Sequence, residues 1–225
     1  MATYVLVHGA WHGGWCWRAV ADRLRGAGHV VFTPTLTGLG ERSHLVTPGT
    51  GLRTHVEDVC GVLRYEDLRD VVLVGHSYAG FVVREAADRM PDRVARLVMV
   101  DGWAGRDGES LDDRAPEYFR AWVDTATVDG LIRPPRPSAV GVTEPDVAAW
   151  LTGLLTPQPR YTFAEPTRLT GAVDDLPCRA VLCTPAGIPF ADWAREFGWS
   201  CVDLATGHDA MITAPDALTR LLAEA

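Results

Sequence analysis

Residues 71–80 read Val71-Val72-Leu73-Val74-Gly75-His76-Ser77-Tyr78-Ala79-Gly80. An aliphatic run of strand type enters a turn of small residues with one serine, and residues 81–87 continue as a helix. This matches the G-x-S-x-G pattern of a nucleophile elbow, except that Ala79 stands at the second glycine position and Gly80 follows it. The stretch predicts a strand, a sharp turn and a helix with Ser77 as a nucleophile. The alternative is a chance match in which Ser77 only caps a helix.

The composition describes a folded domain with a negative surface. The chain has 225 residues, 47% of them hydrophobic, and a formal net charge of −8. This size suits a single domain, and the negative charge argues against nonspecific binding to nucleic acid or to anionic membranes. No apolar run reaches the length of a membrane span. The five scattered cysteines, without a C-x-x-C pair, favour reduced thiols and a cytoplasmic location.

Apolar strands alternate with amphipathic helices over most of the chain. Because each strand is apolar on both faces, we expect an α/β fold with about six parallel strands covered by helices on both faces. The expected strands are 3–7, 29–32, 71–74, 96–100, 179–183 and 199–204. The expected helices are 15–25, 53–65, 81–87, 191–197 and 215–223.

The alternation stops between residues 102 and 170, where prolines and aromatic residues are frequent. We interpret this stretch as a small helical cap inserted in one domain that spans residues 1–225. It contains two candidate helices, near 116–125 and 144–155.

A serine needs a base to act as a nucleophile, and His208 is the best candidate. It follows the last predicted strand, and the loops after parallel strands gather at one edge of the sheet, so His208 and Ser77 can meet there. A solvated loop histidine is the alternative. We expect His76 to support the elbow by packing, and His8 and His12 to line the pocket or to hydrogen-bond the glycine-rich loop at residues 8–14.

These residues carry a family resemblance. The chain resembles the compact α/β-hydrolases that include plant methylesterases, salicylate-binding esterase, hydroxynitrile lyases and many bacterial esterases. The matching stretches are residues 5–15, 36–42, 74–78 and 206–211.

The resemblance implies roles for four residues. Ser77 attacks an ester carbonyl, His208 accepts and returns its proton, and the backbone N–H groups of Ala10 and Tyr78 form an oxyanion hole. Two positions argue against hydroxynitrile lyase activity, since that chemistry in the family uses a threonine where this chain has Ala10 and a lysine where it has Asp209.

The acid that orients the histidine is missing from its usual place. In the family it follows the strand before the last, but residues 183–189 contain no carboxylate. We expect Asp101, at the end of the strand after the elbow strand, to replace it; a structural carboxylate at the cap junction is the alternative. Minor candidates are Asp203 and either Asp174 or Asp175, whereas Asp209 adjoins the histidine and cannot easily reach the far ring nitrogen.

The prediction is therefore a cofactor-free serine hydrolase acting on a small ester or thioester. Pockets are apolar with a few polar anchors, so we expect Trp103, Tyr78 and some of Tyr118, Phe119 and Trp122 near the pocket. The residues that we expect to contact the substrate are His12, Trp103, Tyr118 and Trp122. No metal cluster is evident. Two other readings stay open: a lyase or cyclase that uses the serine and histidine for acid–base chemistry, and a noncatalytic binder of a small ligand. The oligomeric state is open too, with a homodimer among the alternatives.

Overall fold

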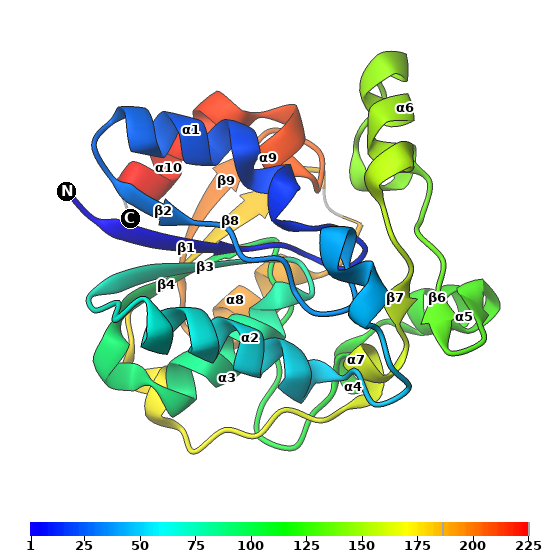
Figure 1. Cartoon of the computed structure of the whole chain (residues 1–225), viewed down its shortest axis with the longest axis horizontal. Helices are drawn as coiled ribbons and strands as arrows, with labels where there is room; N and C mark the ends of the chain where they lie inside the picture. The colour runs from blue at the N-terminus through cyan, green and yellow to red at the C-terminus, as the bar shows by residue number, and fades with distance from the viewer. Residues whose placement is uncertain (186, 225) are drawn as a thin grey trace.

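The computed structural model describes residues 1–185 and 187–224, and its centre is a parallel sheet of six strands in the order β2-β1-β3-β4-β8-β9 (Figure 1). The strands are β1 (Thr3–Val7), β2 (Val30–Phe32), β3 (Val71–His76), β4 (Val94–Val100), β8 (Cys178–Cys183) and β9 (Ser200–Leu204). The predicted fold class, strand number and parallel arrangement are confirmed.

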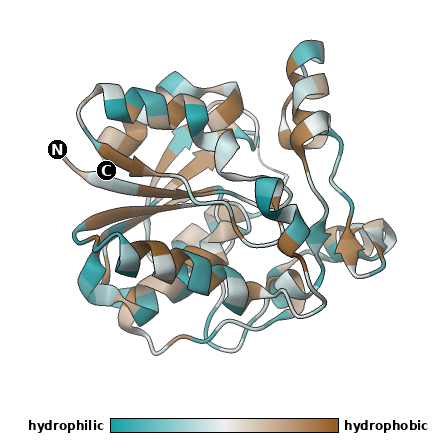
Figure 2. Cartoon of the chain, in the orientation of Figure 1, coloured by the Kyte–Doolittle hydropathy of each residue, from teal (hydrophilic) through white to brown (hydrophobic). Residues whose placement is uncertain are grey.

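Alternate side chains of the central strands enter two separate cores. Val71 and Leu73 of β3 face one core, and Val72 and Val74 face the other. The first core is covered by α2 (Leu52–Tyr65), α3 (Ala79–Arg89) and α8 (Phe190–Glu196); the second is covered by α1 (Arg18–Gly26), α9 (Ala210–Thr213) and α10 (Pro215–Ala223) (Figure 1). Because both faces are buried, the central strands are mostly apolar, and Figure 2 shows much of their length in brown.

One predicted helix differs at its start. The helix expected at residues 15–25 begins as a 3₁₀ turn, η1 (Gly14–Trp17), and becomes α-helical only at Arg18. The N–H of Gly14 donates to the Thr35 hydroxyl at 2.8 Å, and Cys16 N–H donates to the Gly13 carbonyl at 3.1 Å. These contacts hold the first turn in the tighter conformation.

The segment between β4 and β8 contains the two predicted helices, now α5 (Glu117–Ala126) and α6 (Pro145–Leu154). It also contains two short helices and a small antiparallel sheet that the sequence did not predict: α4 (Leu111–Arg114), α7 (Tyr161–Ala164), β5 (Thr127–Val128), β6 (Leu131–Ile132) and β7 (Gln158–Pro159). Strands of two residues are too short to show an alternating pattern.

The remaining described elements are four 3₁₀ turns: η2 (Gly40–Leu45), η3 (Pro91–Arg93), η4 (Pro137–Val140) and η5 (Ala172–Asp175). The segment between β4 and β8 lies at the side of the sheet toward which β1 runs, and α6 stands out from the body of the molecule (Figure 1). In the described part of the chain, no helix has both the length and the apolar character that a membrane crossing requires.

Candidate active site

Ser77 follows β3 directly and adopts the left-handed conformation, with φ at +52°. Its N–H donates to the Val100 carbonyl at 3.1 Å, and its own carbonyl accepts from the N–H groups of Gly80 and Trp103. A Cβ atom at Gly80 would lie 2.1 Å from the Trp103 carbonyl oxygen. The glycine is therefore required one residue later than in the usual pattern, and the strained backbone at Ser77 is held by the chain on both sides.

His208 contacts Asp101. The Nδ1 atom of His208 lies 2.9 Å from Oδ2 of Asp101, a distance at which Nδ1–H donates to the carboxylate. The imidazole also stacks on the Phe190 ring, with 5.5 Å between centroids and an interplanar angle of 7°. Two contacts at different sides of the ring fix its orientation, and the bond to Asp101 leaves Nε2 as the nitrogen that can accept a proton.

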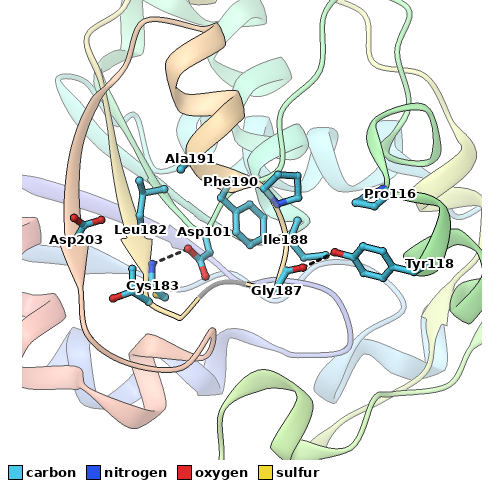
Figure 3. Close-up of a pocket in the computed structure, with 12 residues that line it drawn as sticks. Asp101, Pro116, Tyr118, Leu182, Cys183, Gly187, Ile188, Phe190, Ala191 and Asp203 are labelled. Carbon is cyan, nitrogen blue, oxygen red and sulfur yellow. Dashed lines mark hydrogen bonds between the residues drawn. The ribbon is translucent and has the colours of Figure 1, made fainter.

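Asp101 is fixed by backbone groups of β8. It is 2% exposed, its N–H donates to Val181 O at 2.9 Å, and its Oδ1 accepts from Cys183 N–H at 2.8 Å. Figure 3 shows this bond beside a second cavity of about 530 Å³ that borders Asp101. Residues 183–189 are the segment in which the family's acid usually stands, and residue 186 of this segment lies outside the described part of the chain. The segment that lacks a carboxylate thus supplies an N–H to the carboxylate of the neighbouring strand.

The other carboxylates considered from sequence lie elsewhere. Asp203 is an exposed residue of β9, and Asp174 forms an ion pair with Arg84 at 3.0 Å. Asp175 belongs to the same turn, η5. Asp209 is fully buried and faces His12, with 3.1 Å between Oδ2 and Nε2. Asp101 is thus the carboxylate that the structure brings to Nδ1 of His208.

Ala10 and Tyr78 present backbone N–H groups beside Ser77. Both residues line the same cavity as Ser77 and His208. Within residues 1–185 and 187–224, neither N–H has a hydrogen-bond acceptor in the protein. Gly9 permits the close approach of the two loops, since a Cβ there would lie 2.9 Å from Cβ of Ser77. An oxyanion hole requires free N–H donors of this kind, so Ala10 and Tyr78 stay its candidate residues.

The Tyr78 side chain is held away from solvent. Its hydroxyl donates to Nδ1 of His55 at 2.9 Å, and Nε2–H of His55 donates to the Thr37 carbonyl at 2.8 Å. Burial raises the pKa of Tyr78 well above its usual value and lowers that of His55 to about 4, so both groups are neutral near pH 7. The Tyr78 side chain is therefore fixed by His55 before any ligand binds.

The cavity at Ser77 measures about 860 Å³ and is mostly apolar. The predicted residues Tyr78, Trp103, Tyr118 and Trp122 all line it. The Tyr118 hydroxyl donates to the Gly187 carbonyl across the edge of this cavity (Figure 3). The aromatic residues that the sequence predictions did not place in the pocket are Trp11, Phe163 and Phe190.

Trp11 connects the glycine-rich loop to the segment between β4 and β8. Its N–H donates to Oε1 of Gln158 at 3.0 Å, its indole N–H donates to Ile132 O at 3.1 Å, and its carbonyl accepts from Thr156 N–H at 2.9 Å. The φ angle of Trp11 is +65°, which is unusual for a residue other than glycine. In the sequence, the position of Trp11 within the glycine-rich loop was the signal that it lines the cavity.

The predicted substrate contact of His12 needs correction. His12 is buried, does not line the cavity, and hydrogen-bonds the Ala10 carbonyl and Asp209 instead. His8 is likewise buried: its Nδ1–H donates to Gly9 O and its Nε2 accepts from Leu36 N–H, and burial lowers its pKa to about 3. Both histidines shape the loop because their ring nitrogens are used by the protein itself.

His76 packs against His208 and hydrogen-bonds its backbone. Its Nε2–H donates to the carbonyl of His208 at 3.0 Å, and its ring lies 4.6 Å from the His208 ring, centroid to centroid. Burial lowers the pKa of His76 well below its usual value, so the ring is neutral. No group of three or more histidine, cysteine, aspartate or glutamate residues suited to a metal ion occurs in the described ranges.

The chain is similar in sequence to known esterases. It is 36% identical, over 99% of both chains, to the carbendazim hydrolyzing esterase of Nocardioides sp. (strain SG-4G). A shorter match, 38% identical over 101 residues, covers 44% of this chain and 40% of methylesterase 9 of Arabidopsis thaliana.

Solved structures share the fold. An extracellular alpha/beta-hydrolase from a Paenibacillus species aligns with a TM-score of 0.89 at 24% identity, over 100% of this chain and 99% of that one. The methylesterase protein MES16 from Arabidopsis aligns with a TM-score of 0.82 at 19% identity, over 100% and 98%. The model of the alpha/beta hydrolase family matches residues 4–221. With this match over nearly the whole chain, and with a full-length relative at 36% identity, the protein belongs to the alpha/beta hydrolase family.

Proposed function

We propose that the protein is a serine carboxylesterase in which Ser77, His208 and Asp101 form the catalytic triad. The observation that carries this proposal is the 2.9 Å contact between His208 Nδ1 and Asp101 Oδ2 in a cavity that also contains Ser77. An imidazole oriented by a buried carboxylate beside a strained serine is the arrangement that acyl transfer requires. The full-length relative named as an esterase supports the same activity.

The reaction follows from the proposed roles. Nε2 of His208 removes the Ser77 proton as Oγ attacks the ester carbonyl, and the oxyanion binds the N–H groups of Ala10 and Tyr78. The imidazolium then protonates the leaving alcohol, which departs and leaves an acyl group on Ser77. Water then attacks the acyl carbonyl and gives a proton to His208. His208 passes this proton to Oγ of Ser77 as the bond between Oγ and the acyl group breaks, which releases the acid.

We assign the role of a cap to residues 102–170. This segment supplies Trp103, Tyr118, Phe119, Trp122 and Phe163 to the cavity. Flat aromatic walls favour an ester that carries a planar apolar group, because such a group makes extensive contact and displaces water from the ring faces. Carbendazim, named for the similar enzyme, is therefore a substrate to test.

A lyase or cyclase has less support than a hydrolase. The reason to consider it was the missing acid in residues 183–189, and Asp101 now stands at the histidine instead. A noncatalytic ligand-binding role is distinguished from hydrolysis by measuring whether the wild-type protein turns the ester over. A cytoplasmic location, and a homodimer in place of a monomer, stay predictions.

The test is hydrolysis of p-nitrophenyl acetate, p-nitrophenyl butyrate and carbendazim by wild-type protein and by Ser77→Ala. We expect the wild type to release p-nitrophenol and the variant to lose at least about 1,000-fold in kcat, since without the hydroxyl no acyl-enzyme forms. Mass spectrometry of stopped reactions should show the acyl adduct on the peptide that contains Ser77.

The control is Ser43→Ala, which removes an exposed hydroxyl and should leave kcat unchanged. A Ser77→Ala protein that is folded and as active as the wild type would contradict the proposal. Binding of the ester without any turnover by the wild type would favour the noncatalytic role.

A further inference from the structure

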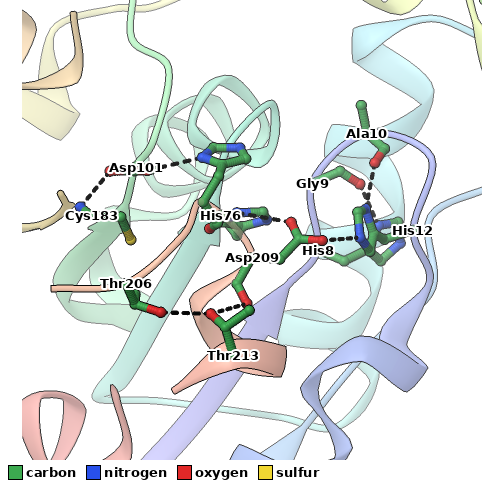
Figure 4. A network of polar contacts seen from close by, with 11 residues as sticks. His8, Gly9, Ala10, His12, His76, Asp101, Cys183, Thr206, Asp209 and Thr213 are labelled. Carbon is green, nitrogen blue, oxygen red and sulfur yellow. Dashed lines mark hydrogen bonds and ion pairs between the residues drawn. The ribbon is translucent and has the colours of Figure 1, made fainter. Parts of the chain in front are cut away.

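The His12 ring is bonded at both nitrogens to oxygen atoms. Nδ1 lies 2.7 Å from the Ala10 carbonyl oxygen, and Nε2 lies 3.1 Å from Oδ2 of Asp209 (Figure 4). A carbonyl oxygen only accepts, so Nδ1 carries a proton. If Asp209 is ionised, Nε2 carries a proton as well, and His12 is an imidazolium.

The charged form is favoured over a neutral one in which the proton sits on Asp209. An aspartic acid is more acidic than an imidazolium by about 2.5 pKa units before any interaction. Although burial opposes charge at both groups, their mutual attraction and hydrogen bond raise the pKa of His12 and lower the pKa of Asp209. His12 is 3% exposed and Asp209 is 0% exposed, so water screens this attraction little.

The His12–Asp209 contact joins the two loops that hold the proposed catalytic groups. His12 hydrogen-bonds the carbonyl of Ala10, and Ala10 lines the cavity. Asp209 is next in sequence to His208, and its N–H donates to Val140 O at 3.0 Å. A change in the His12–Asp209 distance would move the oxyanion donor and the base relative to each other.

We propose that His12 and Asp209 form a buried ion pair that positions the Ala10 loop and the His208 loop for the reaction. Both are positioning residues, since neither lines the cavity. The kinetic part of this inference rests on the proposed esterase function. The existence of the ion pair does not, because it can be observed in the resting protein.

Other titratable groups face the pair from every neighbouring element. They are His8 after β1, Cys16 in η1, His76 in β3, Cys183 in β8 and His208 after β9. Burial lowers the pKa of His8 to about 3 and lowers the pKa of His76 well below its usual value. It raises the pKa of the Cys16 and Cys183 thiols. Among these five groups around the pair, His208 is the one whose charge changes during catalysis.

The pH dependence follows from the directions of the two shifts. The folded pKa of His12 is raised, so the pair is complete below the unfolded value of about 6.5 and is lost as pH rises through the folded pKa. The folded pKa of Asp209 is lowered, so the pair persists until pH falls through that value. The pair should thus add an alkaline limb to the profile of kcat against pH.

The direct experiment is ¹⁵N NMR of the wild-type protein labelled at its histidines. Within the range pH 5 to 8 we expect His12 with both ring nitrogens protonated, and the loss of the Nε2 proton in Asp209→Asn. If the His12 Nε2 carries no proton at any pH from 5 to 8, the ion pair does not exist and the inference is overturned, whatever the enzyme hydrolyses.

The kinetic experiment compares Asp209→Ala and Asp209→Asn with Asp88→Asn. Asp88 is a buried carboxylate on α3 that accepts from Thr170, Gly171 and Val173 N–H groups, so it controls for the loss of a buried charge. We expect Asp209→Ala to lower kcat about 100-fold with KM within about threefold, because misplacement of catalytic groups by about 1 Å has effects of this size.

Asp209→Asn can donate its amide N–H to a neutral His12 and should recover part of that kcat, but without the alkaline limb. Asp88→Asn should retain the wild-type pH profile, whatever its effect on stability. A wild-type pH profile in folded Asp209→Ala would show that the pair positions nothing. Absence of turnover in the wild type would instead contradict the esterase function, and the NMR result would still stand.

Discussion

At the scale of single residues, Asp101 shows what the sequence could and could not predict. Its place at the end of β4, beside the elbow strand, was enough to propose it as the acid, because parallel strands end at one edge of a sheet. The bond from Cys183 N–H to Oδ1 was not predictable. It depends on the register of β4 against β8. A hydrophobic pattern specifies register where one face is buried, and strands buried on both faces lack such an alternating pattern.

Asp101→Asn should lower kcat by about 10⁴-fold with little change in KM. An asparagine amide can donate to Nδ1 of His208, which places the ring proton on Nε2 and prevents it from accepting the Ser77 proton. Steady-state hydrolysis of p-nitrophenyl butyrate measures the effect. Asp203→Asn is the matched control on β9, and a full-rate Asp101→Asn would make Asp101 a structural residue.

His12 meets one of its two expectations: it hydrogen-bonds the glycine-rich loop at the Ala10 carbonyl, but it does not line the cavity. A histidine in a glycine-rich loop next to a pocket is a reasonable ligand contact, but its partner Asp209 lies 197 positions away. Only the three-dimensional fold brings an acid of that separation to a buried imidazole, and a buried histidine then satisfies its nitrogens within the protein.

At the scale of elements, the segment between β4 and β8 combines predictable and unpredictable parts. Its helices α5 and α6 follow from residue pattern and from a proline at each start, since Pro116 is the N-cap of α5 and Pro145 is the first residue of α6. The small sheet of β5, β6 and β7 is held by long-range contacts, among them those of Gln158, which is fully buried. Its Oε1 accepts from Trp11 N–H, and its amide donates to the Thr162 hydroxyl at 2.7 Å.

Gln158→Leu should lower the free energy of unfolding by about 1–3 kcal/mol, since it leaves the buried Trp11 N–H without an acceptor. It should also lower kcat/KM for aromatic esters, because Trp11 lines the cavity. Urea unfolding and steady-state kinetics measure the two effects. The exposed Thr152→Ala on α6 should change stability by no more than about 0.5 kcal/mol, and an equal result for both variants would refute the role of Gln158.

At the scale of the whole molecule, alternating apolar strands and amphipathic helices were sufficient to predict the sheet and both helical layers. The same burial has a consequence for acid stability. His8, His55 and His76 are each no more than 1% exposed, and burial holds all three pKa values below the usual 6.5. The unfolded chain therefore binds more protons than the folded one as pH falls below about 6.5.

We expect the free energy of unfolding to fall with decreasing pH between about 6 and 4.5, by up to about 1.4 kcal/mol per pH unit for each of these histidines. Urea titrations at several pH values give the slope. His55→Gln should reduce that slope by the share of one histidine, whereas the exposed His44→Gln should leave it unchanged. Identical slopes in the two variants would exclude His55 as a contributor.

The three hydrogen bonds of Trp11 have a further consequence, for recombination between relatives. Each one joins the loop after β1 to the segment between β4 and β8, at Ile132, Thr156 and Gln158. That segment is consequently not an independent module. We expect a chimera that takes residues 102–170 from this chain to form the same pocket wall only if its host also supplies a loop that can occupy the place of Trp11.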